Sequence, residues 1–266
     1  MLHLGTSGFS FADWRGTFYP EKISKADMLA FYAARFGAVE LNFSYYTMPL
    51  YRTIQGIADK VDEGFHFSVK AHRSMTHEIP ESEGDRRNAF IAFISGIEPL
   101  VHQGKLGCVL VQFPWAFKPS SQSHDYLGFV SEMLSEIPAV VEFRNSLWVE
   151  RGEVRQRSLQ LLKSLGLGYC CVDEPNLKGL MPPLATATSP IGYIRFHGRN
   201  AKTWWNHETV QERYDYSYSR EELESWLVKI EAIAERTDDV FIFFNNCSRG
   251  QAANNALLMA GLLEDL

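Results

Sequence analysis

Residues 139–144, Ala139-Val140-Val141-Glu142-Phe143-Arg144, combine a β-branched run of strand length with two polar side chains at its end. Apolar, β-branched or aromatic runs of this length recur along the chain, at residues 2–5, 38–42, 65–70, 108–113, 167–172, 191–196 and 240–244. Segments with helical periodicity separate most of these runs, and strands that alternate with helices form parallel sheets. The sequence therefore predicts an α/β fold, a TIM-like (β/α)₈ parallel barrel, with an open doubly wound sheet as the alternative.

Two connections between the strand runs carry distinct local signals. Ser219 and Glu222 have the spacing of a capping box, and apolar side chains repeat on one helical face behind them. Residues 173–190, in contrast, contain four prolines, which leave no room for a regular helix. We therefore expect a well-formed helix after residue 219 and a degenerate, proline-rich sixth crossover that is mostly loop.

Length and composition favour one barrel domain that spans residues 1–266. No linker, internal repeat or low-complexity tract divides the chain, and 45% hydrophobic residues suffice for a sizeable core. A net charge of −6 argues against a protein that coats nucleic acid with its whole surface. No signal-peptide pattern or apolar run of membrane-spanning length is present, so we expect a cytoplasmic protein without a membrane partner. The sequence carries no indication of the oligomeric state.

Polar residues gather where the predicted strands end. Four pairs have i, i+2 spacing, and because strand side chains alternate, both members of a pair face the same side. In a parallel barrel, the carboxyl ends of the strands form the functional face. The pairs are Glu40 with Asn42, Lys70 with His72, Glu142 with Arg144, and Arg195 with His197. Gln112, Asp173, Asn245 and Asn246 add polar groups at other strand ends.

Several of these segments also resemble a known family, the YecE-like family or domain of unknown function 72. The resemblance covers nearly the whole chain. It rests on Gly5-Thr6-Ser7-Gly8, Asp13-Trp14, Phe18-Tyr19-Pro20, Val39-Glu40-Leu41-Asn42, Phe67-Ser68-Val69-Lys70, Thr76-His77, Leu110-Val111-Gln112-Phe113-Pro114, Val141-Glu142-Phe143-Arg144, Tyr193-Ile194-Arg195-Phe196-His197-Gly198-Arg199, Phe244-Asn245-Asn246 and Asn254-Asn255-Ala256. It implies a TIM-like barrel and no specific reaction. This chain has Asn145 and Cys247 where members of the family commonly have histidine.

The strand-end pairs suggest acid/base chemistry. Glu142 could act as a general base beside Arg144, which could clamp an anion; the alternative is a structural ion pair. Glu40 is a second carboxylate, which either divides acid and base roles with Glu142 or orients Asn42. We include His197 and Lys70 with these two carboxylates as candidate catalytic residues.

A cluster of cations after the seventh predicted strand favours an anionic ligand. Arg195 and Arg199 lie there, and barrels often bind phosphate with the loops after strands 7 and 8. Aromatic loops add Trp14, Trp204 and Trp205, which either stack on a sugar or base or pack the loops. The full set of predicted ligand-binding residues is Arg144, Arg195, Arg199, Asn42, Gln112, Asn245, Asn246, Trp14 and His77.

No motif in the sequence demands a cofactor. Glu40, His72, His77, Glu142, Asp173 and His197 could supply metal ligands, but their spacing is not diagnostic. We predict no metal and no cofactor, with a divalent metal as the alternative. The four cysteines lack metal-ligand spacing and are expected to be reduced thiols; Cys247 is either a nucleophile or a small packing residue.

These observations predict an enzyme that uses acid/base chemistry on a small anionic substrate, phosphorylated or sugar-containing, at the carboxyl-terminal mouth of the barrel. Arg144, Arg195 and Arg199 are expected to hold the substrate. Two alternatives stay open: a metal-dependent phosphodiester hydrolase of the nuclease type, and a noncatalytic module that binds a ligand or RNA. We also expect one solvent-accessible pocket to unite Lys70, Glu142, Arg144, Arg195 and His197.

Overall fold

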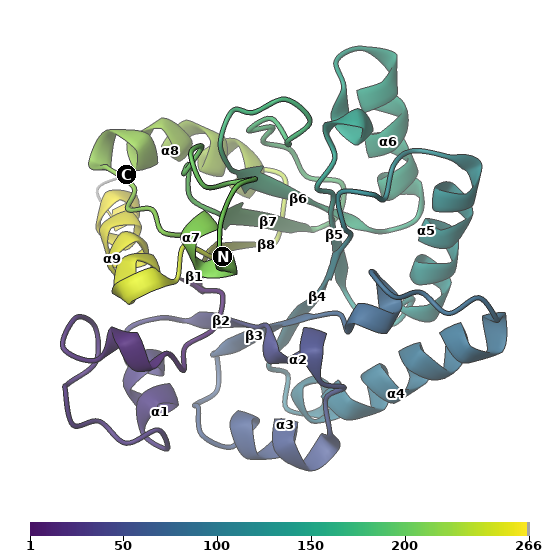
Figure 1. Cartoon of the computed structure of the whole chain (residues 1–266). Helices are drawn as coiled ribbons and strands as arrows, with labels where there is room; N and C mark the ends of the chain where they lie inside the picture. The colour runs from purple at the N-terminus through teal and green to yellow at the C-terminus, as the bar shows by residue number, and fades with distance from the viewer. Residues whose placement is uncertain (265–266) are drawn as a thin grey trace.

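The strands of the protein form a nearly closed parallel barrel, seen in Figure 1 inside a ring of helices. The computed structural model describes residues 1–264. The strands are hydrogen-bonded in the order β1-β8-β7-β6-β5-β4-β3-β2. Their bounds are β1 Leu2–Thr6, β2 Ala38–Leu41, β3 His66–Lys70, β4 Leu106–Gln112, β5 Ala139–Glu142, β6 Gly168–Asp173, β7 Ile191–Phe196 and β8 Asp239–Phe244. The predicted TIM-like barrel is confirmed, and each of the eight expected runs overlaps one strand.

Helices follow most strands and pack outside them. The α-helices are α1 Met28–Ala33, α2 Phe43–Tyr46, α3 Tyr51–Ala58, α4 Glu83–His102, α5 Ser121–Met133, α6 Glu153–Ser164, α7 Val210–Arg213, α8 Arg220–Ala234 and α9 Gln251–Glu264. Short 3₁₀ turns are η1 Ala12–Trp14, η2 Arg73–Met75, η3 Ser146–Val149 and η4 Ser248–Gly250. The predicted capping box opens α8. Residues 174–190, all in the described part of the chain, contain no helix, so the sixth crossover is degenerate as expected.

The barrel closes at a seam between β1 and β2. Within residues 1–264, a single β-bridge, between Ser7 and Glu40, joins the two strands. Below it the Tyr32 hydroxyl accepts the Thr6 N–H at 2.7 Å and donates to the Ala38 carbonyl at 3.1 Å. A Cβ on Gly5 would lie 2.0 Å from the Ala38 oxygen, so only glycine allows this approach.

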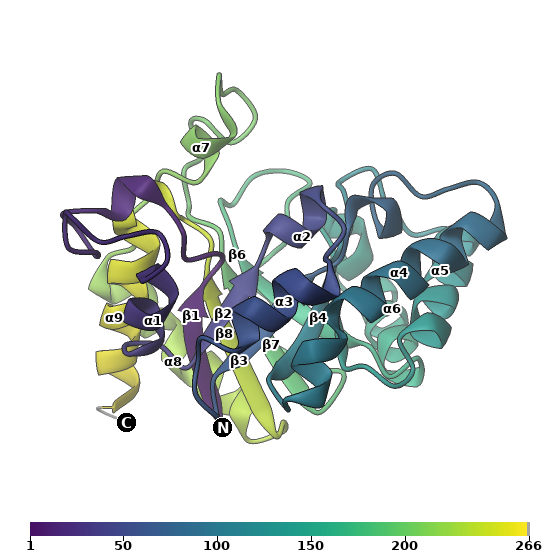
Figure 2. The same ribbon diagram turned by 90° about the horizontal axis from the view of Figure 1, so that it is seen from below.

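The two ends of the barrel differ in their role. Figure 2 shows α2, η1 and α7 at the end where the strands finish, and the N-terminus at the opposite end. Loops that follow the strands therefore surround one mouth, the usual location of sites in such barrels. Within the described residues, no helix combines the length and apolar character needed to cross a membrane.

Candidate active site at the mouth of the barrel

A buried layer of opposite charges lies beneath the mouth. Arg195 on β7 reaches across the barrel, and its Nη2 lies 2.7 Å from Glu40 Oε1 on β2. Its Nη1 lies 2.6 Å from Glu142 Oε2 on β5. The three side chains are at most 1% exposed. Period-2 alternation places all three inside the barrel, because each belongs to an inward-facing strand position.

Both carboxylates of this layer are fully engaged. Glu40 Oε2 accepts from the Tyr193 hydroxyl at 2.7 Å, and Oε1 accepts from Asn42 at 2.9 Å. Glu142 Oε1 lies 2.9 Å from Arg144 Nη1 and 3.1 Å from His197 Nε2. These contacts leave neither carboxylate with an oxygen free to receive a proton from a substrate.

The charges of the layer lower the pKa values of its carboxylates. Burial alone would raise the pKa of Glu142, but Arg195 and His197 hold that pKa well below 4.5. At Glu40, too, burial alone would raise the pKa, but the charge of Arg195 lowers it. Both carboxylates are therefore ionised at neutral pH. This geometry favours the structural ion pair over the expected general-base role of Glu142.

His197 is likewise committed to the layer. It is fully buried, and its Nδ1 lies 3.1 Å from Asn245 Nδ2. Its Nε2 lies 2.9 Å from Arg144 Nη1 and 3.1 Å from Glu142 Oε1, so both ring nitrogens already have polar neighbours. Burial, followed by the charge of Arg144, lowers the pKa of His197 to about 3. The imidazole is neutral near pH 7 and has no nitrogen left for a ligand.

Above this layer lies a cavity of about 500 Å³, which we call the mouth cavity. It brings together the predicted residues Asn42, Lys70, Gln112, Arg195 and Asn245 from five strand ends. Its remaining lining residues are Ser7, Phe11, Asp13, Tyr46, Tyr214, Cys247 and Ser248. The expected convergence is therefore partial, because Glu142 and His197 lie below the cavity.

Lys70 is the cation most available in the mouth cavity. Its Nζ donates to Gln112 Oε1 at 2.9 Å and lies 4.6 Å from the centre of the Tyr45 ring. Within residues 1–264, no carboxylate lies within ion-pair distance of this ammonium. Burial, and then the charge of Arg195, lower the pKa of Lys70 from 10.5 to about 8. A substantial fraction of this amine is therefore neutral near physiological pH.

A second compartment of about 190 Å³, which we call the side pocket, adjoins the mouth cavity. The two share Gln112 and Tyr214. The other side-pocket residues are His77, Pro114, Trp115, Arg144, Leu180, Trp204, Trp205 and Arg213. The Cζ atoms of Arg144 and Arg213 lie 5.6 and 5.5 Å from the centre of the Trp204 ring. Burial, and then the charge of Lys70, lower the pKa of His77 from 6.5 to about 4.

Arg213 is a site residue that the sequence analysis missed. Its Nε donates to the Trp204 carbonyl at 3.0 Å, and no carboxylate of the described residues pairs with it. Arg144, in contrast, lies 3.2 Å from Glu174 as well as beside Glu142. The only sequence signal for Arg213 was a cation next to Tyr214 within an aromatic loop.

Three predicted ligand-binding residues lie outside both compartments. Trp14 is fully buried and donates from Nε1 to the Cys247 carbonyl at 2.7 Å, so it packs the first loop and offers no stacking face. Arg199 binds both oxygens of Asp173, at 2.8 and 2.6 Å. Asn246 donates to the Tyr216 carbonyl at 2.7 Å. Existing partners therefore occupy Trp14, Arg199 and the amide nitrogen of Asn246, whereas Asn246 Oδ1 is buried without a partner.

The two positions that differ from the family pattern have local structural roles. Asn145 accepts the Leu147 N–H at 3.1 Å and so caps η3. Burial raises the pKa of the Cys247 thiol above its usual range, which suits a packing residue better than a nucleophile. All four cysteines are free thiols. Among residues 1–264, no three His, Cys, Asp or Glu side chains are grouped so that they could hold a metal ion.

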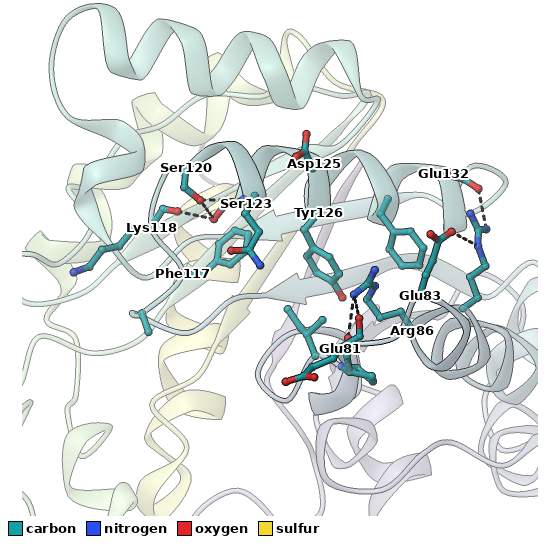
Figure 3. Close-up of a pocket in the computed structure, with 16 residues that line it drawn as sticks. Glu81, Glu83, Arg86, Phe117, Lys118, Ser120, Ser123, Asp125, Tyr126 and Glu132 are labelled. Carbon is teal, nitrogen blue, oxygen red and sulfur yellow. Dashed lines mark hydrogen bonds and ion pairs between the residues drawn. The ribbon is translucent and has the colours of Figure 1, made fainter.

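A groove of about 940 Å³, larger than the mouth cavity, lies between α4 and α5 and the loops that precede these two helices (Figure 3). Its lining includes the cations Arg86, Arg87 and Lys118. Arg86 donates to the carbonyls of Pro80 and Glu81, and Arg87 pairs with Glu83 and Glu132. The mouth cavity, although smaller, is the better candidate for chemistry, because it gathers polar side chains from five strand ends, where the sites of such barrels lie.

Comparison with known proteins identifies the family. The family model described as Protein of unknown function DUF72 matches residues 3–266. The UPF0759 protein YunF of Bacillus subtilis (strain 168) is 33% identical, covering 99% of this chain and 95% of that protein. The crystal structure of a DUF72 family protein from Thermotoga maritima MSB8 is 39% identical, with a TM-score of 0.90 and 99% of both chains covered. Another, from Enterococcus faecalis V583, is 28% identical, with a TM-score of 0.88, covering 99% of this chain and 96% of the other. The chain therefore belongs to the DUF72 family.

Proposed function

We propose that the protein is an enzyme that performs acid/base chemistry on a small anionic compound, phosphorylated or sugar-containing, at the mouth of the barrel. One observation carries this proposal. Among the described residues, Lys70 and Arg213 face adjoining cavities, and neither has a carboxylate partner. A cation without a counter-charge in a partly enclosed site is stabilised when an anion binds there.

Lys70 supplies the acid/base group in this proposal. A group whose pKa lies near the working pH exchanges protons efficiently in both directions, and the pKa of Lys70 is about 8. Glu40 and Glu142 do not compete for this role, because both are buried and each of their oxygens already accepts a hydrogen bond. Their function in the proposal is to hold Arg195 and to fix the floor of the cavity.

The side pocket holds the anionic end of the substrate. Arg213 lies there beside Arg144, and guanidinium groups bind phosphate through two parallel hydrogen bonds. The indoles of Trp115 and Trp205, 43% and 54% exposed, meet edge to face at 6.3 Å. Exposed indoles of this kind stack on the apolar face of a sugar ring.

Ligand binding tests the proposal. Isothermal calorimetry with ribose 5-phosphate, and with ribose as the uncharged probe, measures the contribution of the phosphate. We expect the phosphorylated sugar to bind more tightly than ribose. Arg213→Gln should weaken its binding about 10- to 100-fold, because one charge-assisted interaction contributes about 1.5–3 kcal/mol.

Arg249→Gln is the matched control. Arg249 lies near the same mouth, but it is 75% exposed, pairs with Asp215 at 3.3 Å and lines neither compartment. The control should bind ribose 5-phosphate as the parent does. Equal binding of ribose and ribose 5-phosphate, or equal weakening by both substitutions, would contradict an anion site in the side pocket.

A further inference from the structure

The environment of Lys70 suits a nucleophile as well as a proton carrier. Its Nζ lines a cavity of about 500 Å³ at the end of β3. The Tyr45 ring covers one side of the amine, and Gln112 Oε1 receives one of its hydrogens. A neutral amine has two hydrogens and one lone pair, so one hydrogen and the lone pair remain available. The hydrogen bond to Gln112 also restricts the amine to few orientations.

We propose that the amine of Lys70 attacks the carbonyl carbon of an aldehyde or ketone substrate and forms an imine with it. This inference rests on the proposed function, since the substrate must enter the same cavity. It narrows the substrate class to carbonyl compounds, such as 2-oxo acids or the open-chain form of a phosphorylated sugar. The covalent bond to Lys70 would then activate the neighbouring C–H and C–C bonds of the substrate.

The reaction balances with one proton from solvent as the only additional reactant. The Nζ lone pair forms the C–N bond, the carbonyl π electrons move to oxygen, and one proton passes from nitrogen to that oxygen. The nitrogen lone pair then expels hydroxide as the C–O bond breaks, and the hydroxide takes a proton from solvent. The products are a protonated imine and one water. Hydrolysis reverses these steps and releases the amine.

The cavity offers groups that fit this sequence. The amide nitrogen of Gln112 has no protein acceptor among the described residues, and it lines the cavity beside Lys70. It can donate to the oxygen that becomes negative during the attack. The surroundings of Lys70 favour its neutral, nucleophilic form, and the charges of Glu40 and Glu142 offset part of the cost of the cationic imine. The charged and titratable groups that act on Lys70 or lie against it are Glu40, Tyr45, His77, Glu142, Arg144 and Arg195.

Lys105 provides an internal comparison. It is also buried, at 7% exposure, but it precedes β4 at the opposite end of the barrel. Its Nζ donates to the carbonyls of Ala58 and Val61 at 2.9 and 2.8 Å. An ammonium that is held by two carbonyls, and that lines neither the mouth cavity nor the side pocket, should not form an imine. The difference between the two lysines therefore lies in access and partners, and not in burial alone.

Reductive trapping tests the inference. The whole protein is incubated at pH 7.5 with dihydroxyacetone phosphate and sodium cyanoborohydride, and modified lysines are located by peptide mass spectrometry. The reduced adduct adds the mass of the probe less one oxygen atom. We expect Lys70 to be modified roughly a hundredfold faster than exposed lysines, because its environment lowers its pKa from 10.5 to about 8 and leaves more of the amine unprotonated. Lys70→Arg should abolish the adduct and Lys105→Arg should retain it.

The imine proposal would be overturned if Lys70 were modified no faster than the exposed lysines. This measurement uses the parent protein, so it does not depend on whether the variants fold. An adduct that persists in Lys70→Arg would overturn it as well. Dihydroxyacetone without phosphate separates the two proposals. Equal trapping rates for both probes at Lys70 would support the imine and contradict the anionic substrate. Faster trapping of the phosphorylated probe would support both.

Discussion

Lys70 illustrates how position changes the chemistry of a single residue. Its side chain lies among buried charges of both signs, yet its own ammonium has a hydrogen bond to Gln112 and no ion pair within the described chain. The folded protein therefore disfavours the protonated form, which costs stability. Functional groups often carry such a cost, because the properties that serve chemistry oppose tight packing.

The pH dependence of stability should reveal this cost. The pKa of Lys70 is about 8 in the folded protein and 10.5 in an ordinary environment. Below pH 8, Lys70 is protonated in both the folded and the unfolded protein, and the folded protein is destabilised by the full cost of the buried charge. Between pH 8 and 10.5 the unfolded protein binds more protons than the folded one, so the free energy of unfolding rises with pH. We expect Lys70→Met to be more stable than the parent by about 1–2 kcal/mol at pH 7, with partial exposure of the side chain taken into account.

Urea unfolding at pH 7 and at pH 10 measures this difference. The advantage of Lys70→Met should shrink at the higher pH, where the parent amine has lost its proton. Lys60→Met, at an exposed lysine, should match the parent at both values. A stability difference for Lys70→Met that is the same at pH 7 and pH 10 would show that Lys70 is not destabilised by its charge.

At the scale of elements, the seam between β1 and β2 decides whether the barrel closes. One β-bridge and the Tyr32 hydroxyl join these strands in the described chain, whereas the other neighbours share longer ladders. Tyr32 is fully buried and belongs to α1, so a helix supplies the bond that the two strands do not make with each other. Ser7 and Asn42, at the top of this seam, line the mouth cavity.

Removal of the Tyr32 hydroxyl tests the importance of the seam. Tyr32→Phe leaves the Thr6 N–H and the Ala38 carbonyl buried without this partner, which should cost about 1–3 kcal/mol of unfolding free energy. Thermal and urea unfolding measure the loss. Tyr51→Phe is the comparison, because Tyr51 is 46% exposed on α3 and its hydroxyl makes no hydrogen bond within residues 1–264. If both variants match the parent, the hydroxyl does not hold the seam.

At the scale of the whole molecule, the buried charge layer connects distant parts of the barrel. Arg195 joins β7 to β2 and β5, across sequence separations of 155 and 53 residues. Removing one member of a buried ion pair leaves the others without a counter-charge. The layer thus links the floor of the mouth cavity to the stability of the fold, and Arg195 is a poor choice for testing ligand binding alone.

Arg195→Met should destabilise the protein by about 3–5 kcal/mol at pH 7, because two buried carboxylates lose their counter-charge. Burial would raise the pKa values of Glu40 and Glu142, but Arg195 lowers both below 4.5. Their contribution to stability is therefore present above pH 4.5 and lost as the pH falls through the folded pKa values. In Arg195→Met these carboxylates accept protons more readily, so the gap to the parent should narrow toward pH 4.

Urea unfolding at pH 7 and pH 4 measures this gap. Arg157→Met removes an exposed ion pair with Glu153 on α6, and it should change the unfolding free energy by less than about 0.5 kcal/mol. A gap for Arg195→Met that stays constant between the two pH values would mean that the carboxylates do not depend on Arg195 for their charge.

The sequence by itself was enough to predict the barrel, the α8 capping box and the proline-rich loop, expected over residues 173–190 and found over residues 174–190. These features follow from period-2 and period-3.6 patterns, a cap spacing and prolines, which act over a few neighbouring residues. The same alternation placed Glu40, Lys70, Glu142 and Arg195 at the mouth. The position of these four residues at strand ends could therefore be predicted from the sequence alone.

Only the tertiary structure decided which of those charges are already paired. Arg195 and Arg199 are neutralised by carboxylates, while Lys70 and Arg213 have none within the described chain. Pairing depends on contacts between residues that are far apart in sequence, such as Arg195 and Glu40, and on how deeply each group is buried. No local sequence pattern determines the distances between such residues. Which cations are available to a ligand therefore depends on the tertiary structure of the barrel.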